Sequence, residues 1–316
     1  MILAEDYLGF LERDYLHGYL EEGGSALKFV VPPDDAAAGY FVERFASVAE
    51  GAGFAVAKVD AAETRVHILE QVFFAVARQL DWDGLASRAT RKALAGAGYP
   101  APDEGVALDS IASHYGVDPR ELKRDVDRQL QEQVSRDYAM VQEFRTAMLR
   151  LCQAQLRSGQ VVDAEHTAVV DWLRGELRQI SVLKSALIFR KIGRHNARHM
   201  LFSLAHWLAV NDRSGLALLL DIRRLGFPRR PSPEERHGHY YTRPALFDAY
   251  EMLREMVDNA DEMANCIVVV VASPAFLTDA ARGLDVYQAL KLRIFDEVRD
   301  ANRDNPYSAL VRLGAA

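Results

Sequence analysis

Short apolar segments and long amphipathic segments alternate along the chain, and together they predict a sheet covered by helices. The short segments predict strands, and they lie at residues 26–31, 54–60, 215–221, 266–272 and 309–313. In the third and fourth of these the apolar residues are continuous rather than alternating. Because this is typical of strands that are covered on both faces, we expect a mostly parallel sheet between two layers of helices.

The helical pattern, with apolar residues three or four positions apart, recurs over the rest of the chain. It predicts helices over residues 5–19, 36–50, 64–80, 120–134, 137–158, 165–179, 194–210, 243–264 and 285–299. The first two strands and the helix between them form a β–α–β unit, so we expect this pair to be parallel with a right-handed crossover. The predicted fold class is α/β, a three-layer sandwich with five strands. Residues 84–210 contain no convincing strand and are predicted to be a helical insertion within a single domain spanning residues 1–316.

Composition and charge narrow the class of protein. The chain has 45 acidic and 38 basic side chains and a net charge of −7, which argues against a surface that coats nucleic acid throughout. Its two cysteines, Cys152 and Cys266, are too few for a disulfide framework or a thiolate metal site. The longest apolar run is far shorter than the roughly 20 residues that span a bilayer, and acidic residues stand where a signal peptide is basic. We therefore expect a cytoplasmic protein that does not associate with membranes.

Asp221 ends the third predicted strand, where a P-loop nucleotide hydrolase carries the aspartate that orients Mg²⁺. In many such ATPases the next residue is a glutamate that polarises water. Here it is Ile222, which cannot accept a proton. The alternative interpretation of Asp221 is a strand-end residue that caps a turn.

The turn after the first strand is where such an enzyme binds phosphate, with glycine amides and a lysine in the pattern G-x-x-x-x-G-K-[ST]. This chain has Pro32, Pro33, Asp34 and Asp35 in that turn. The prolines remove two amide donors, and the carboxylates repel a triphosphate that approaches the start of the following helix. The pattern occurs nowhere else in the chain. We conclude that the sheet either never bound nucleotide or has lost its phosphate loop, and we predict no cofactor.

Histidines at helical spacing are the weakest candidate site. His195, His199 and His206 are four and seven residues apart, so they are predicted to share one face of a helix. Two imidazoles one turn apart can bind a metal ion, but no glutamate follows the first histidine as in H-E-x-x-H. A packed or interface face is the preferred interpretation, and no metal is predicted.

Basic residues form two local clusters on this acidic chain. The first follows Asp221 and consists of Arg223, Arg224, Arg229, Arg230 and Arg236. The second precedes the histidines and consists of Arg190, Lys191, Arg194 and Arg198. Both are suited to a phosphate backbone or an acidic protein partner, but the preferred interpretation is a solvated loop whose arginines pair with carboxylates and helix dipoles. Tyr240 and Tyr241 lie beside the first cluster, where they either stack on bases or anchor the loop to the core.

Several segments carry a family resemblance, at residues 53–60, 196–201, 215–221, 272–277 and 282–284, with Tyr287 and Arg293 after them. Over residues 26–313 the chain resembles the ATP-binding domain family of BREX phage-defence systems, an AAA+-like group of P-loop ATPase relatives. The resemblance implies a P-loop-type sheet, with Asp221 as the Mg²⁺-orienting aspartate and Ser273 near the end of the sensor strand. It also implies that Arg198 or Arg293 is a charge-completing arginine.

These observations predict a non-catalytic subunit of an antiviral defence system that lacks its P-loop. By resemblance it acts through assembly, either with itself or with an ATPase-competent partner. The alternative is a DNA-binding adaptor that uses the arginine-rich loop. A third and weaker hypothesis is an ATPase with an unconventional phosphate site.

Overall fold

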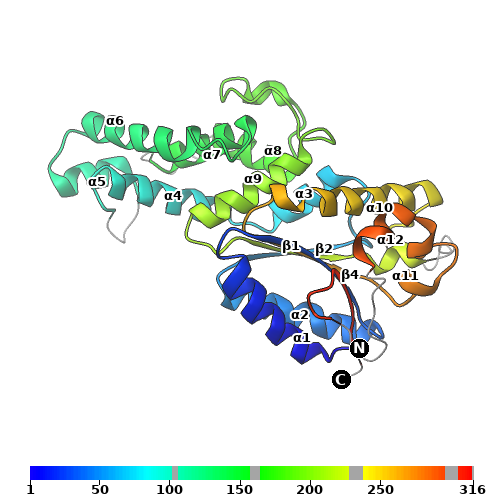
Figure 1. Ribbon diagram of the computed structural model, residues 1–316. Coiled ribbons are helices and arrows are strands. Elements are labelled where there is room, and N and C mark those ends of the chain that lie inside the picture. The colour runs from blue at the N-terminus through cyan, green and yellow to red at the C-terminus, as the bar shows by residue number, and fades with distance from the viewer. Residues whose placement is uncertain (102–105, 157–163, 228–237, 296–304, 315–316) are drawn as a thin grey trace. The chain divides into compact units, whose positions relative to one another are not determined.

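A computed structural model describes residues 1–101, 106–156, 164–227, 238–295 and 305–314 (Figure 1). The chain divides into two compact units. The first comprises Met1–Val76 and Arg213–Ala316, and the second is Ala77–Asp212. The predicted insertion, residues 84–210, lies within the second unit.

The first unit contains a five-stranded sheet in which every neighbouring pair is parallel. Its strands are β1 (Ser25–Val31), β2 (Ala55–Asp60), β3 (Leu216–Asp221), β4 (Cys266–Val271) and β5 (Leu310–Arg312). They lie in the order β2-β3-β4-β1-β5. The predicted α/β class and the parallel sheet are thus confirmed, and the five apolar segments correspond to the five strands.

The first two strands are parallel, but they are not neighbours. β1 pairs with β4 and β5, whereas β2 pairs with β3 at one edge of the sheet. The β–α–β unit therefore crosses two strand positions. The two positions between them are taken by β3 and β4. Both of these strands are almost wholly buried, as is typical of the interior of a parallel sheet.

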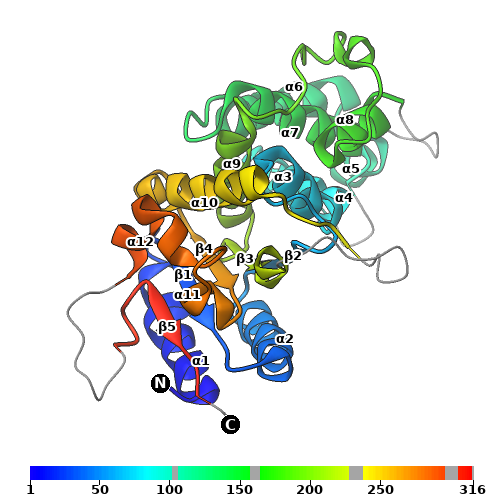
Figure 2. The ribbon, with the colours of Figure 1, turned by 90° about the vertical axis from the view of Figure 1, so that its right-hand side faces the viewer.

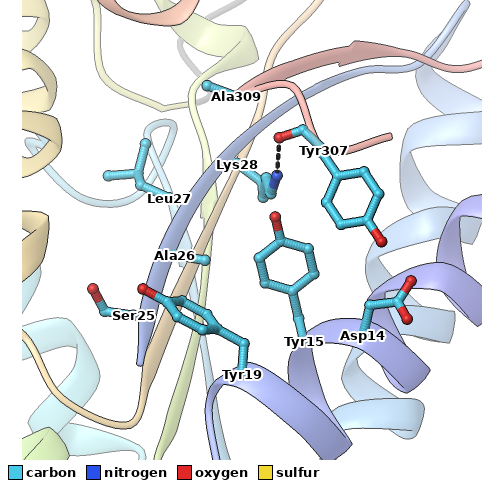
Figure 3. A pocket seen from close by; sticks show the side chains of 9 residues that line it. All are labelled: Asp14, Tyr15, Tyr19, Ser25, Ala26, Leu27, Lys28, Tyr307 and Ala309. Carbon is cyan, nitrogen blue, oxygen red and sulfur yellow. Dashed lines mark hydrogen bonds between the residues drawn. The ribbon is translucent and has the colours of Figure 1, made fainter. Parts of the chain in front are cut away.

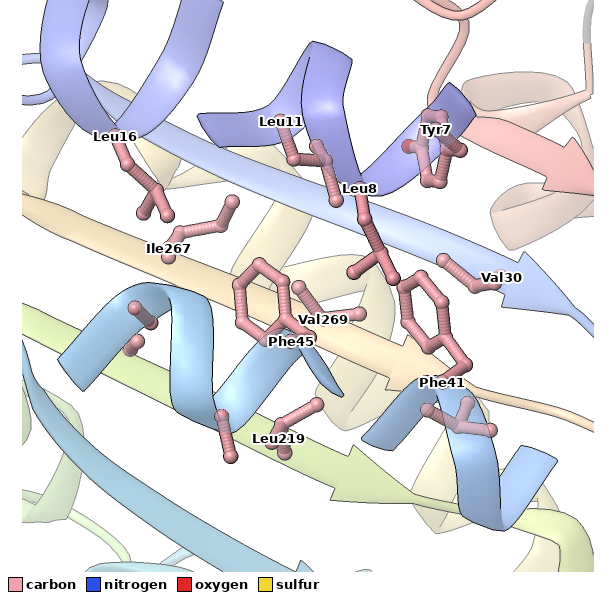
Figure 4. Packing of buried hydrophobic residues seen from close by; sticks show 14 of the residues in the cluster. Tyr7, Leu8, Leu11, Leu16, Val30, Phe41, Phe45, Leu219, Ile267 and Val269 are labelled. Carbon is pink, nitrogen blue, oxygen red and sulfur yellow. The ribbon is translucent and has the colours of Figure 1, made fainter. Parts of the chain in front are cut away.

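One face of the sheet is covered by α1 (Ala4–Phe10), the π-helix η1 (Leu11–Tyr19) and α2 (Asp35–Gly51), as Figures 1 and 2 show. Tyr7 and Leu8 of α1 and Phe41 and Phe45 of α2 are buried against this face (Figure 4). Alternate residues of the strands complete the cluster, including Val30, Leu219, Ile267 and Val269. This packing explains the helical periodicity over residues 5–19 and 36–50.

The other face of the sheet is covered by α10 (Arg243–Asp258), α11 (Ala275–Thr278) and α12 (Gln288–Ile294) (Figure 2). Phe29 of β1 stacks on Phe276 of α11, with ring centroids 6.1 Å apart, and Tyr250 of α10 meets the edge of Phe276. Three 3₁₀ turns join these elements, namely η4 (Arg223–Gly226), η5 (Ala260–Glu262) and η6 (Leu284–Val286). Helices on both faces make the first unit the predicted three-layer sandwich.

The second unit contains helices and no strand among its described residues. The helix α3 (Leu69–Arg78) leads into it. The α-helices that follow are α4 (Trp82–Gly96), α5 (Leu108–Tyr115), α6 (Pro119–Leu130), α7 (Gln142–Gln155), α8 (Ala164–Arg174) and α9 (Ala197–Val210). The π-helix η2 (Gln131–Ser135) and the 3₁₀ turn η3 (Ile180–Leu183) are its other helical elements.

None of the helices in the described ranges is both long enough and apolar enough to cross a membrane.

Candidate functional site

The ends of three neighbouring strands bring the predicted nucleotide residues to one edge of the sheet. Asp221 is the last residue of β3 and lies opposite Val271 of β4, which in turn lies opposite Val30 of β1. Ser273 follows β4 by two residues, and the Pro32–Asp35 turn follows β1. Because ligands of open α/β sheets bind beyond the carboxyl ends of the strands, this edge is the candidate site.

The turn after β1 lies where a P-loop binds phosphate. Pro32 is buried, and Asp34 is the N-cap of α2. The Asp34 carboxylate accepts a hydrogen bond from the backbone N–H of Ala37 at 2.8 Å. An N–H group in the first turn of α2, of the kind that holds a phosphate in such proteins, is thus already bonded to an anion of the chain itself.

Arg223 joins the ends of β3 and β1 through its guanidinium group. Its Nε lies 3.0 Å from both carboxylate oxygens of Asp221, and one terminal nitrogen lies 2.6 Å from Asp221 Oδ2. The other terminal nitrogen donates to Oδ1 of Asp35 at 2.6 Å. We call this arrangement the Arg223 bridge. It connects the aspartate that would orient Mg²⁺ to the first residue of the helix that would receive the phosphate.

The bridge is strong at Asp221 and weak at Asp35. The Asp221 side chain is 17% exposed, and it also accepts the backbone N–H of Arg223 at 3.0 Å. The Asp35 side chain is 91% exposed, so solvent screens that contact. The hydrogen bond to Asp221 is the main cause that raises the pKa of Arg223. A metal ion at Asp221 would have to displace a charge-assisted pair worth about 1.5–3 kcal/mol.

The described part of the arginine-rich loop is held inside the first unit. Arg224 donates from Nε to the carbonyl oxygen of His239 at 2.8 Å, and its guanidinium lies 4.2 Å from the ring centroid of Phe227. The buried Tyr241 hydroxyl donates to the Thr64 carbonyl at 2.6 Å, and burial raises the pKa of Tyr241 to about 12. Of the two interpretations of Tyr241, the structure supports the anchor. The other arginines of this cluster, Arg229, Arg230 and Arg236, lie outside the described residues.

Arg282 is a site residue that the sequence analysis missed. Its side chain is buried, and it donates to the carbonyl oxygens of Leu225 at 2.8 Å and Tyr241 at 2.7 Å. It therefore fixes the η4 turn that carries Arg223. The resemblance included residues 282–284, but one arginine in a polar segment gives no sign that its charge is buried.

The two predicted charge-completing arginines lie elsewhere. Arg293, on α12, forms an ion pair with Asp258 of α10 and donates to the Ala289 carbonyl at 2.7 Å. The hydrogen bond from Arg293 is the main reason why the pKa of Asp258 lies below its usual value. Arg198 belongs to the second unit, where its Nε is buried without a hydrogen-bond partner among the described residues. Ser273 is half-buried, and its carbonyl accepts the N–H of Phe276 at the start of α11.

The prediction that His195 shares a helix face with His199 and His206 is wrong, because α9 begins only at Ala197. His195 lies in the preceding turn, where the Asn196 side chain accepts the N–H of Gly193 at 2.8 Å. His199 is exposed, and His206 lies 2.7 Å from an oxygen of Asp137. Within the described ranges, no three histidine, cysteine or acidic side chains are grouped so that they could hold a metal ion.

Comparison with known proteins identifies the family. A family model described as "BREX system ATP-binding protein BrxC/D" matches residues 13–315. Searches of curated proteins and of solved structures each returned no match. The family match includes all five strands, the Arg223 bridge and the whole second unit. The chain belongs to the family of BREX system ATP-binding proteins BrxC/D.

Proposed function

We propose that this BREX component is a non-catalytic subunit that acts by assembly, with itself or with an ATPase-competent partner. The Arg223 bridge is the observation that carries the proposal. Its guanidinium supplies a positive charge to Asp221 and Asp35, where Mg²⁺ and its nucleotide would otherwise neutralise the carboxylates. Asp221 therefore already has a cation partner without a ligand, while the exposed Asp35 adds a further negative charge to this edge.

The residues around the bridge also lack the groups that hydrolysis requires. Ile222 is buried beside Asp221 and cannot take a proton from water. The Pro32–Asp34 turn offers no lysine to a β- or γ-phosphate, and Asp34 occupies an amide at the start of α2. These features support a subunit that neither binds nor hydrolyses ATP.

Part of the second unit offers exposed cations for assembly. The side chains of Arg178, Lys184, Arg190 and Arg194 are exposed, and in the described part of the chain none of them forms an ion pair. Arg223 and Arg293, by contrast, already hold carboxylates of their own unit. Residues 178–194 are therefore the proposed contact with an acidic partner surface.

Phosphate release by the purified chain, alone and mixed with an ATPase-competent BREX protein, tests this proposal. We expect no hydrolysis by the chain alone and a changed rate for the mixture. The double variant R190E/R194E should weaken that change, whereas R13A, at an exposed ion pair of the first unit, should not. Hydrolysis by the chain alone that disappears in D221N would contradict the proposal.

A DNA-binding adaptor is the second candidate, and one observation favours it. The Phe189 side chain is 61% exposed in the same basic segment, as expected for a residue that stacks on an unpaired base. Fluorescence anisotropy with a labelled single-stranded oligonucleotide separates the two functions. Affinity that falls steeply with salt and is lost in F189A would favour the adaptor, and salt-independent or absent binding would favour protein assembly.

A further inference from the structure

A cavity lies at the opposite end of the sheet from Asp221. This cavity of about 450 Å³ is lined by residues 25–28 in the amino-terminal half of β1, together with Asp14, Tyr15, Tyr19, Tyr307 and Ala309 (Figure 3). The tyrosines come from two separate segments, η1 and the loop before β5. No residue of this cavity takes part in the Arg223 bridge.

The floor of the cavity is an open strand edge. β5 pairs only with Phe29–Val31, so Ser25–Leu27 have no strand neighbour on that side among the described residues. Four consecutive residues line the cavity although their side chains alternate between the faces of the sheet, so the cavity runs along the backbone. The N–H of Phe29 donates to Ala309 on this side at 2.7 Å, and by the alternation of the strand the amide of Leu27 points the same way.

Lys28 places a buried positive charge in this cavity. The residue is 3% exposed, and its Nζ donates to the carbonyl oxygens of Tyr307 at 2.8 Å and Ser308 at 3.2 Å. The ammonium lies 4.5 Å from the ring centroid of Tyr15. The Asp14 carboxylate, which also lines the cavity, pairs with Arg13 instead, and no carboxylate in the described ranges pairs with Lys28. Burial lowers the pKa of Lys28 to about 8. A buried charge without a counter-ion is costly, which favours an anion from outside the chain.

The wall of the cavity has an unusual backbone. Tyr15 and Tyr19 lie on η1, a nine-residue π-helix, and their rings meet edge to face at 6.2 Å. Helices of this kind are rare and frequently occur at functional sites. The tyrosine rings are partly exposed and supply apolar surface beside the charge.

We propose that this cavity binds the free C-terminus of an extended peptide. The peptide backbone pairs with the open edge at Ser25–Leu27, its side chains contact the tyrosines, and its terminal carboxylate meets the Lys28 ammonium. The Tyr307–Ala309 segment already occupies the edge beyond Lys28, so an added strand must end there. The open edge is three residues long, and an added strand that ends before Tyr307 places its terminal carboxylate beside Lys28. This function is separate from the proposed ATPase-like assembly.

The proposal can be tested by passing two mixtures of tetrapeptides over the immobilised full chain. The mixtures are identical except that one has free C-terminal carboxylates and the other has C-terminal amides. Mass spectrometry of the retained peptides should show the free acids at least about tenfold enriched, because a charge-assisted hydrogen bond is lost in the amides. Equal retention of the two mixtures, or retention of neither, would overturn the proposal.

Variants separate the site from the fold. K28M should abolish the enrichment, and Y19A, which keeps the ammonium, should reduce it several-fold. K58M is the matched control, because Lys58 lies on β2 in an exposed ion pair with Glu43. Unaltered selection by K28M, with a thermal transition like that of the unsubstituted chain, would contradict the assignment. Benzoate that competes as well as the best tetrapeptide would show a site for small acids and would refute strand addition.

Discussion

Arg223 makes its contacts with two carboxylates that are far apart in the sequence, at the ends of β3 and of the turn after β1. The contact with Asp221 is local, because the two residues are two positions apart, whereas the contact with Asp35 depends on the fold. From the sequence, Arg223 was a candidate contact for a partner or nucleic acid, with a solvated loop and carboxylate pairing as the preferred alternative. In the fold it faces inward, because the 3₁₀ turn η4 folds back over the strand end and Arg282 holds that turn.

Replacing Arg223 tests the strength of the bridge at the scale of one residue. R223A leaves the partly buried Asp221 without its cation, so we expect the free energy of unfolding to fall by about 1–3 kcal/mol in urea titrations. R13A should change it by less than about 0.5 kcal/mol, since its ion pair with Asp14 is exposed. Equal stabilities of R223A and R13A would show that the bridge contributes nothing.

The pH dependence of stability tests the burial of Lys28. Its pKa is about 8 in the folded chain and 10.5 in the unfolded chain, so between these values the unfolded chain binds more protons. The free energy of unfolding should therefore rise with pH from about 8 to 10.5, relative to K28M. The total gain is on the order of 3 kcal/mol. Urea titrations of both proteins across this range measure it, and parallel pH profiles would show that Lys28 is not desolvated.

At the scale of elements, the start of α2 shows how the chain ends its first strand and begins a helix without a glycine loop. Pro32 and Pro33 end the pairing of β1, and Asp34 caps the helix. D34A should destabilise the protein by about 1 kcal/mol, because the Ala37 N–H loses its acceptor.

D34N is the matched control, because asparagine caps helices as well as aspartate does. Thermal denaturation should place D34N near the unsubstituted protein and D34A clearly below it. A loss of stability in D34N as large as that in D34A would mean that the charge of Asp34, and not its hydrogen bond, is what stabilises the helix.

The strands and most helices were predictable because burial imposes their patterns. The run at 266–272 is apolar on both faces and became the central strand β4, and the spacing in 36–50 became α2. The start of α9 was not predictable, since Asn196 and Gly193 form a hydrogen-bonded turn that displaces His195 from the helix. The strand order was equally hidden, because β1 and β2 are adjacent in sequence yet separated by two strands.

At the scale of the whole molecule, the candidate site was only half predictable. The positions of Asp221 and of the Pro32–Asp35 turn follow from the rule that parallel strands end at one edge. The Arg223 bridge and the support from Arg282 depend on loops packed against each other, which leave no periodic pattern in the sequence. The cavity at Lys28 was hidden as well, since it forms only where the short β5 stops pairing with β1.

The central claim is that this edge of the sheet is closed to nucleotide by the chain's own charges. Isothermal titration calorimetry of the purified protein with ATP and Mg²⁺ tests it most directly. The account predicts no binding tighter than a Kd of about 1 mM. A micromolar Kd that is lost in D221N would contradict it, because Asp221 would then hold the metal ion that the Arg223 bridge is proposed to replace.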